Sequence, residues 1–199
     1  MFILYAVLIG LVVGFALGGR GSGLAELRFR FAWLAVAGFA AQVVIFSAPL
    51  SDRIGDFGAP LYVASTGLVF AVLLVNARIP GLAIVAVGAA SNLAAIVANG
   101  GYMPASAGAL VEAGKLPAAG YSNSTVLADP LLAPLTDIFA LPRWLPFHNV
   151  FSIGDLLIGL GIGLAIVLAM RRRAPTGQEP TAQAPTEHEP TGQTRPTAG

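Results

Sequence analysis

Asp155 is the carboxylate with the clearest local pattern in this sequence. It stands three residues after Ser152, at the start of a long apolar run. This spacing is typical of a capping box, in which the hydroxyl accepts from a first-turn N–H and the carboxylate reaches back to the cap. A structural role as a helix cap is therefore sufficient. The alternative is that Asp155 binds an ion or a substrate with His148 or Asn149, although its seven-residue separation from His148 carries no metal signature.

Polar side chains inside the apolar runs are the second group of candidates, because polar groups are costly in hydrocarbon. They are Gln42, Ser65, Thr66, Ser91 and Asn92, and none of them is ionisable. In a transporter or channel, Gln42, Ser91 and Asn92 would line a path for the substrate. In the structural alternative they form hydrogen bonds between helices, worth about 0.6 kcal/mol each. The lack of a charge inside the runs argues against a proton relay or an ion-coupled carrier.

Several kinds of chemistry are excluded or disfavoured. The chain has no cysteine, which excludes thiolate nucleophiles and thiolate metal sites. No HExxH, GxSxG or P-loop pattern is present. We therefore predict no catalytic residue, no metal and no cofactor, and an enzyme is disfavoured. The one dense basic cluster, Arg171–Arg173, directly follows an apolar run, so we expect no nucleic-acid partner.

The composition places these residues in a membrane protein. Only 11% of the residues are charged and 56% are hydrophobic, whereas a soluble domain carries about 25% charged residues. Five apolar runs cover residues 2–19, 31–50, 59–77, 81–98 and 151–170. Each is about as long as a helix needs to be to cross a bilayer. We therefore predict an all-α, polytopic transmembrane helix bundle with five spans, whose first run is an uncleaved helix.

The distribution of arginine predicts the orientation of these spans. Positive residues in short loops mark the cytoplasmic side. One side of the membrane receives Arg20, Arg28 and Arg30, then Arg78, and finally Arg171, Arg172 and Arg173. This pattern predicts an N-terminus outside and a C-terminus inside. The arginine-, alanine- and glycine-rich composition suggests a bacterium, so the expected location is the bacterial inner membrane, with membrane lipids as the first partners.

Two regions follow from this topology. Residues 1–170 form the transmembrane domain, with a long outer-face loop at 99–150 that is rich in proline and glycine. Within the loop we expect short helices at 106–113, capped by Ser106, and at 131–141. Residues 171–199 are a basic stop and a Pro/Thr-rich tail, which repeats Pro-Thr and has no large apolar residue. Such a segment is expected to be disordered in the cytoplasm.

Glycine is frequent in the first and last runs. Gly10 and Gly14 form a G-x-x-x-G pattern, and Gly159, Gly161 and Gly163 lie close together. Small residues allow membrane helices to approach closely. Whether these faces pack within one chain or between two copies is left open by the sequence.

Two segments carry a family resemblance. Ala98-Asn99-Gly100-Gly101-Tyr102-Met103-Pro104 closes the fourth run, and Asn149-Val150-Phe151-Ser152-Ile153-Gly154-Asp155 opens the fifth. This pair, separated by a Pro- and Gly-rich loop, resembles an uncharacterised family of small bacterial integral membrane proteins, catalogued as a domain of unknown function. The resemblance covers residues 1 to about 170. It implies membership but no activity, and it directs attention to the outer-face loop, which both segments border.

These observations lead to one leading function and two rivals. The leading hypothesis is an accessory or structural membrane protein that binds a partner, a lipid or a small ligand at its outer-face loop. The candidate surface is Asn99, Gly100, Gly101, Met103, Pro104, His148, Asn149, Ser152 and Asp155. A small transporter or channel subunit, which would need a homo-oligomer or another membrane protein as partner, is the alternative. A membrane enzyme that uses Asp155 and His148 on an outer-leaflet substrate is the third.

Overall fold

The protein is described by a computed structural model that covers residues 2–47, 50, 53–115 and 124–172. Five helices in these ranges are longer than ten residues: α1 (Phe2–Ala16), α3 (Ala32–Ile45), α5 (Gly58–Val75), α6 (Leu82–Ala98) and α8 (Ile153–Met170). Each lies within one of the predicted apolar runs or differs from it by a residue or a few. Residues 48 and 49 of the second run and the tail from residue 173 lie outside the described ranges.

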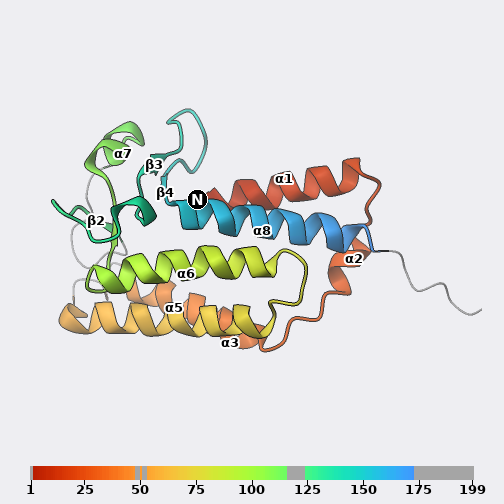
Figure 1. The fold of residues 1–199 in the computed structure, drawn as a ribbon, viewed down its shortest axis with the longest axis horizontal. Helices are drawn as coiled ribbons and strands as arrows, with labels where there is room; N and C mark the ends of the chain where they lie inside the picture. The colour runs from red at the N-terminus through yellow and green to blue at the C-terminus, as the bar shows by residue number, and fades with distance from the viewer. Residues whose placement is uncertain (1, 48–49, 51–52, 116–123, 173–199) are drawn as a thin grey trace, which may run out of the picture.

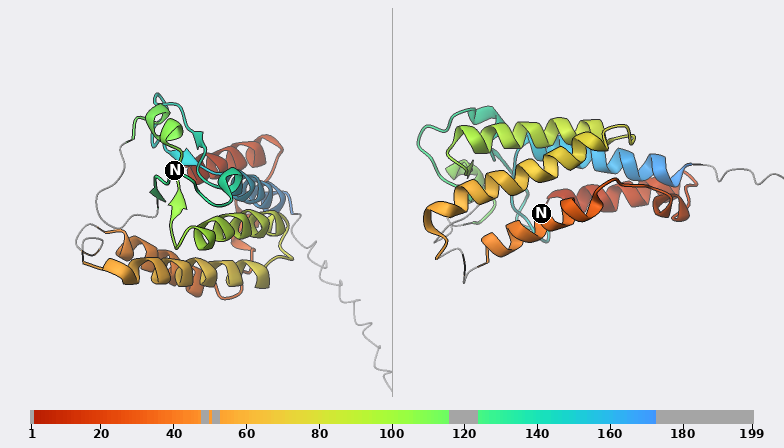
Figure 2. Two further views of the ribbon diagram at one scale, coloured as in Figure 1. Left: turned by 60° about the vertical axis from the view of Figure 1, so that its left-hand side comes forward. Right: turned by 90° about the horizontal axis from the view of Figure 1, so that it is seen from below.

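The long helices pack side by side in the order α1, α8, α6, α5, α3. Figure 1 shows that helices successive along the chain run in opposite directions, whereas the packed neighbours α1 and α8 run in the same direction, from the cap end of the bundle to the other. The second view of Figure 2 shows the same alternation from below. The short helix α2 (Ser22–Ala25) lies beside the end of α8, and the 3-10 turn η1 (Gly55–Phe57) precedes α5.

The chain is mostly helical, and two of its helical segments are long and apolar enough to cross a membrane. They are Gly55–Val75, which joins η1 to α5, and Ile153–Met170. The other three long helices are apolar but contain 10–17 residues. A helix needs about 20 residues to cross a hydrocarbon core about 30 Å thick. The helical parts of these three segments are therefore shorter than a full crossing requires.

Glycines set the spacing of α8 against both of its neighbours. A Cβ atom at Gly10 would lie 3.0 Å from Cα of Gly163, which brings α1 and α8 into backbone contact. On the other face, a Cβ at Gly81 would lie 2.3 Å from the carbonyl oxygen of Gly161. The predicted glycine faces therefore pack within one chain, and a side chain at these positions would push the helices apart.

A folded cap covers the end of the bundle at which α1 begins. We use "the cap" for residues 99–115 and 124–151. It contains α7 (Ala107–Glu112), the 3-10 turn η2 (Ala133–Leu135) and four two-residue strands: β1 (Met103–Pro104), β2 (Ser124–Thr125), β3 (Phe139–Ala140) and β4 (Val150–Phe151). β1 pairs with β2 in parallel, and β3 pairs with β4 in antiparallel register.

The cap confirms one predicted helix and corrects another. α7 begins after Ser106, whose hydroxyl accepts from the N–H of Ala109 at 3.4 Å, as expected for its N-cap. The helix predicted at 131–141 is wrong: this segment is a single 3-10 turn followed by β3. Pro134, at the start of η2, explains why no helix runs through residues 131–134, because its ring removes a helical N–H and clashes with the preceding turn. The strands were not predicted. Their pairing provides hydrogen-bond partners for backbone N–H and C=O groups of the cap that lie outside its helices.

Candidate functional site

The candidate site lies where α6 and α8 meet the cap. Asn92 on α6 donates from Nδ2 to Oδ1 of Asp155 at 2.9 Å, and its Oδ1 accepts from the hydroxyl of Ser152 at 2.8 Å. Ser152 is fully buried. Both ends of the Asn92 carboxamide are therefore bound to the first turn of α8.

The predicted capping box is present in full. The N–H of Asp155 donates to the hydroxyl of Ser152 at 3.0 Å, and the N–H of Ser152 donates to Oδ2 of Asp155 at 3.1 Å. Each oxygen of Asp155 accepts one of these fixed donors, one from Asn92 and one from Ser152. Asp155 is thus a helix cap, and it also carries a negative charge that is held in place from α6.

Close helix packing makes this contact possible. A Cβ at Gly154 would lie 1.9 Å from Oδ1 of Asn92, and one at Gly88 would lie 2.4 Å from the carbonyl oxygen of Gly154. Two glycines opposite each other let α6 and α8 touch through their backbones at this level. The side chain of Asn92, one turn beyond Gly88, consequently reaches the start of α8.

Asp137 adds a second carboxyl group to this site. Its backbone N–H donates to the carbonyl of Pro104 at 2.9 Å, and its own carbonyl accepts from Ser106 at 3.0 Å, which fixes it beside β1. Its side chain is only 9% exposed. Burial, and to a lesser extent the negative charge of the nearby Asp155, together raise the pKa of Asp137 from 3.8 to about 7.

The carboxyl group of Asp137 accepts no hydrogen bond from any residue that the structure describes, in contrast to that of Asp155. A buried carboxylate without donors is costly, so at acidic pH the group is neutral. Near pH 7 it exchanges a proton readily. The arrangement is thus suited to holding either a proton or a cationic group next to Asp155.

Asp137 was not among the residues singled out from the sequence. A signal was present, since it is the only charged residue between Pro130 and Pro142. A lone carboxylate in an apolar stretch is either solvent-exposed or functional. The sequence does not show which, because the contact with Asp155 depends on how the cap folds back on α8.

The segment 98–104, the first of the two on which the family resemblance rests, anchors the cap to the bundle. The side chain of Asn99 forms two hydrogen bonds with the backbone of Leu131. Its Nδ2 donates to the carbonyl of Leu131 at 2.8 Å, and its Oδ1 accepts from the N–H of Leu131 at 2.9 Å. Gly101 has a φ of +91°, and a Cβ there would lie 2.5 Å from Cβ of Ala59 on α5. Met103 and Pro104 are buried in β1 beneath the cap, whereas Gly100 is exposed. These residues hold β1, to which the backbone of Asp137 is hydrogen-bonded.

His148 and Asn149 form hydrogen bonds within the hairpin of β3 and β4. The Nδ1 atom of His148 lies 3.1 Å from the carbonyl of Leu145, within the connection between β3 and β4. The carbonyl of Asn149 accepts from Leu141 at 2.9 Å in the same hairpin. Among the described residues, no hydrogen bond joins His148 to Asp155.

Two of the polar candidates within the apolar runs, Gln42 and Asn92, form hydrogen bonds in two different helix pairs. Gln42 on α3 donates to the hydroxyl of Thr66 on α5 at 3.2 Å. Asn92 binds to the start of α8, as described above. The hydroxyl oxygen of Ser91 is buried and has no partner in the part of the chain that the structure describes. Gln42 and Asn92 thus satisfy the structural interpretation, hydrogen bonding between helices.

Comparison with models of known protein families identifies a match for most of the chain. The model of a protein family described as "Family of unknown function (DUF5317)" matches residues 26–167, which is more than half of the chain. This range includes both segments on which the family resemblance rests, and it includes Asp137. No curated protein and no solved structure matches the chain.

Proposed function

This chain belongs to the family of unknown function DUF5317, and from that premise we propose that it is a five-span membrane protein that binds a small cation at its cap. Membership supplies no activity, so the proposal depends on the geometry of the chain. The observation that carries it is the buried carboxyl group of Asp137, which has no hydrogen-bond donor among the described residues and lies next to Asp155.

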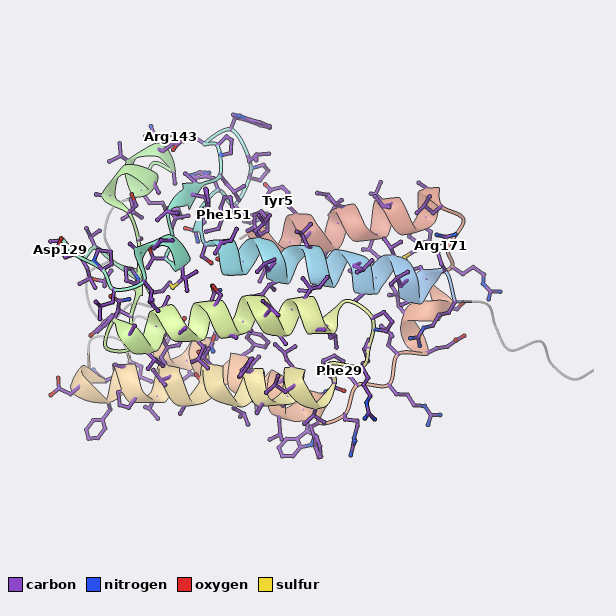
Figure 3. All side chains as sticks on the ribbon, in the orientation of Figure 1. Tyr5, Phe29, Asp129, Arg143, Phe151 and Arg171 are labelled. Carbon is purple, nitrogen blue, oxygen red and sulfur yellow. The ribbon has the colours of Figure 1, made fainter. Side chains whose placement is uncertain are left out.

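Three features support the five-span topology in a bacterial inner membrane. Large apolar side chains are exposed along the outside of α1 and α3, such as Leu8, Val36 and Val43. Contiguous exposed apolar surface is unusual in a soluble monomer and is what a lipid-facing helix presents. The helices alternate in direction, and Arg171 lies at the opposite end from the cap in Figure 3. Arginine at one end favours an N-terminus outside and a C-terminus inside.

The connection between β3 and β4 supports contact of the cap with the membrane surface. Trp144 is 80% exposed at this connection, and Phe147 is exposed three residues later. The hydroxyl of Tyr5, on α1, donates to the carbonyl of Pro146 in the same connection. Aromatic side chains of this kind are enriched where a membrane meets water. The cap would then lie at the outer interface, above the ends of α1 and α8.

The orientation is testable because the chain has no cysteine. We expect a membrane-impermeant maleimide to label Asp129→Cys, in the cap, in intact cells. Ser22→Cys, on α2, should be labelled only after the membrane is permeabilised. Both positions are exposed. Labelling of Ser22→Cys in intact cells with Asp129→Cys protected would reverse the orientation. Labelling of both in intact cells would contradict an odd number of spans between the two positions.

The geometry favours a small cation over the other occupants of the cap. Asp137 and Asp155 concentrate negative charge, while Asn92 and Ser152 hold Asp155 in place. A protonated amine would supply the positive charge and also N–H donors for the carboxyl group of Asp137, which has none among the described residues. Charge-assisted hydrogen bonds of this type are about twice as strong as neutral ones. Binding would also shift Asp137 to its charged form.

Binding should therefore depend on pH in a defined direction. A proton competes with the cation at Asp137, so affinity is expected to be constant well above pH 7 and to fall about tenfold per pH unit below it. We suggest titrating the purified full-length protein with primary alkylamines by calorimetry at pH 8 and pH 5.5. Sodium and magnesium chloride, at matched ionic strength, show whether a metal cation is the better ligand.

Two variants give this titration its control. Asp137→Asn should abolish binding, whereas Asp129→Asn, which changes an exposed carboxylate in the same cap, should leave it intact. Equal binding by Asp137→Asn and the wild type would refute the site. Binding that is lost equally in both variants would indicate attraction to the overall charge of the cap.

A further inference from the structure

A groove at the other end of the bundle brings together arginines from two connections. Arg28 and Arg30 come from the segment between α2 and α3, and Arg78 comes from the turn between α5 and α6. The groove has a volume of about 520 Å³, and its remaining lining residues are Leu74, Val75, Asn76 and Ile79. No carboxylate is among these lining residues, so three arginines line one space without an acidic residue beside them. The guanidinium group of Arg30 lies over the ring of Phe31, 5.8 Å from its centroid.

Asn76 holds the two walls of this groove together. Its side chain is 3% exposed at the end of α5. Its Oδ1 accepts from the N–H of Arg30 at 2.8 Å, and its Nδ2 donates to the carbonyl of Arg30 at 2.9 Å and to that of Val72 at 2.8 Å. The carboxamide thus pairs with Arg30 as a neighbouring strand would. The backbone that carries Arg30 is consequently fixed before any ligand arrives, which lowers the entropic cost of binding.

The side chains around the groove match an amphiphilic ligand. Leu74 and Val75 on the last turn of α5 are exposed beside the arginines. Guanidinium groups bind phosphate through paired, charge-assisted hydrogen bonds. Basic pockets between membrane helices on the cytoplasmic side bind the headgroups of acidic lipids. A ligand with a phosphate next to an acyl chain would use both the charged and the apolar parts of this wall.

We propose that the groove bounded by Arg28, Arg30 and Arg78 is a binding site for a phosphate group, that of an acidic phospholipid whose acyl chains lie along Leu74 and Val75. The phosphate would lie between the two connections and neutralise charges that no lining carboxylate balances. This site is separate from the carboxyl pair under the cap. It would join the connection before α3 to the end of α5 through the lipid as well as through Asn76.

Native mass spectrometry of the full-length protein tests this site. The protein is released from nanodiscs that contain equal amounts of phosphatidylglycerol and phosphatidylcholine. We expect the wild type to retain phosphatidylglycerol in preference. The triple variant Arg28→Gln/Arg30→Gln/Arg78→Gln should retain it at least about tenfold less, because the charge-assisted hydrogen bonds to the phosphate are lost.

The matched control removes three arginines from the same end of the bundle but outside the groove. Arg20→Gln/Arg171→Gln/Arg172→Gln lowers the net charge equally and should keep the lipid preference. An equal loss in both triple variants would show general attraction to the basic end and overturn the site. Unchanged retention in the groove variant would overturn it as well.

Two further measurements complete the test. Excess inorganic phosphate should leave the lipid bound if the headgroup is the ligand. If phosphate displaces the lipid and binds alone to lipid-free protein in detergent, the groove is a site for free phosphate. Size-exclusion chromatography reports folding of the triple variant. If it aggregates, the exposed single variant Arg78→Gln carries the test, with the same direction and a smaller loss.

Discussion

Replacing Asp137 by Asn is expected to stabilise the protein at pH 8 and to remove most of the pH dependence of its stability between pH 4 and pH 7. The wild type should lose stability over this interval as the pH rises. Asn has nearly the shape of Asp but stays neutral. The variant therefore keeps the packing under β1 while it removes a buried charge.

The direction follows from proton linkage. The pKa of Asp137 is about 7 in the folded protein against 3.8 for the free side chain. The folded state therefore binds the proton more tightly than the unfolded state. This contribution to stability is fully present below about pH 4, falls as the pH rises, and is lost above about pH 7. Since each pH unit in this window corresponds to about 1.4 kcal/mol, the whole effect is on the order of 4 kcal/mol.

Thermal unfolding in detergent at pH 4.5 and pH 8 measures this effect. Asp129→Asn is the control, because it removes an exposed carboxylate from the same cap. If Asp137→Asn were less stable than the wild type at pH 8, the carboxylate would have a favourable partner in the folded protein. If Asp137→Asn is more stable than the wild type and also fails to bind amines, the site shows the trade-off between stability and function that is common at binding sites.

Hydropathy alone was enough to locate the five long helices. Their apolar runs end at charges such as Arg20 and Arg78 or at the Asn99-Gly100-Gly101 turn, and these are signals that act within a few residues. Their packing order was not predictable in the same way. It depends on which glycines face each other, and the pairing of Gly10 with Gly163 joins positions that are far apart in sequence.

Only those contacts of the site that join residues close in sequence were predictable. The capping box of Ser152 and Asp155 depends on a spacing of three residues, and the structure confirms it. Asn92 was identified as a polar residue in an apolar run, but its partner was not. Asp137 was missed because its burial and its position near Asp155 arise from the pairing of Asp137 with residues 104–106, which lie about thirty residues earlier in the cap. Such contacts are set by tertiary structure, which local patterns do not encode.

The largest structural effect is expected for Gly154→Ala. The added Cβ would lie 1.9 Å from Oδ1 of Asn92 and 2.7 Å from the carbonyl oxygen of Gly88. Relief of the first contact requires the side chain of Asn92 to move, and relief of the second requires α6 to move away from α8. The hydrogen bonds that Asn92 accepts from Ser152 and donates to Asp155 would then be lost. Overpacking costs about 1–3 kcal/mol and each lost hydrogen bond about 1 kcal/mol. We expect a loss of about 3–5 kcal/mol in the free energy of unfolding, together with loss of the ligand site.

Gly67→Ala is the matched control, because a Cβ at Gly67 on α5 would meet no atom within 4 Å. It should be neutral or stabilising by up to about 1 kcal/mol, the advantage of Ala over Gly inside a helix. Urea or thermal unfolding in detergent compares the two variants. Adding Asn92→Ala to Gly154→Ala should restore part of the stability, because it removes the nearer of the two clashes but not the one with the backbone of Gly88. Equal stability of Gly154→Ala and Gly67→Ala would mean that α6 and α8 lie farther apart at this level than the geometry indicates. The carboxamide of Asn92 could not then hold Asp155.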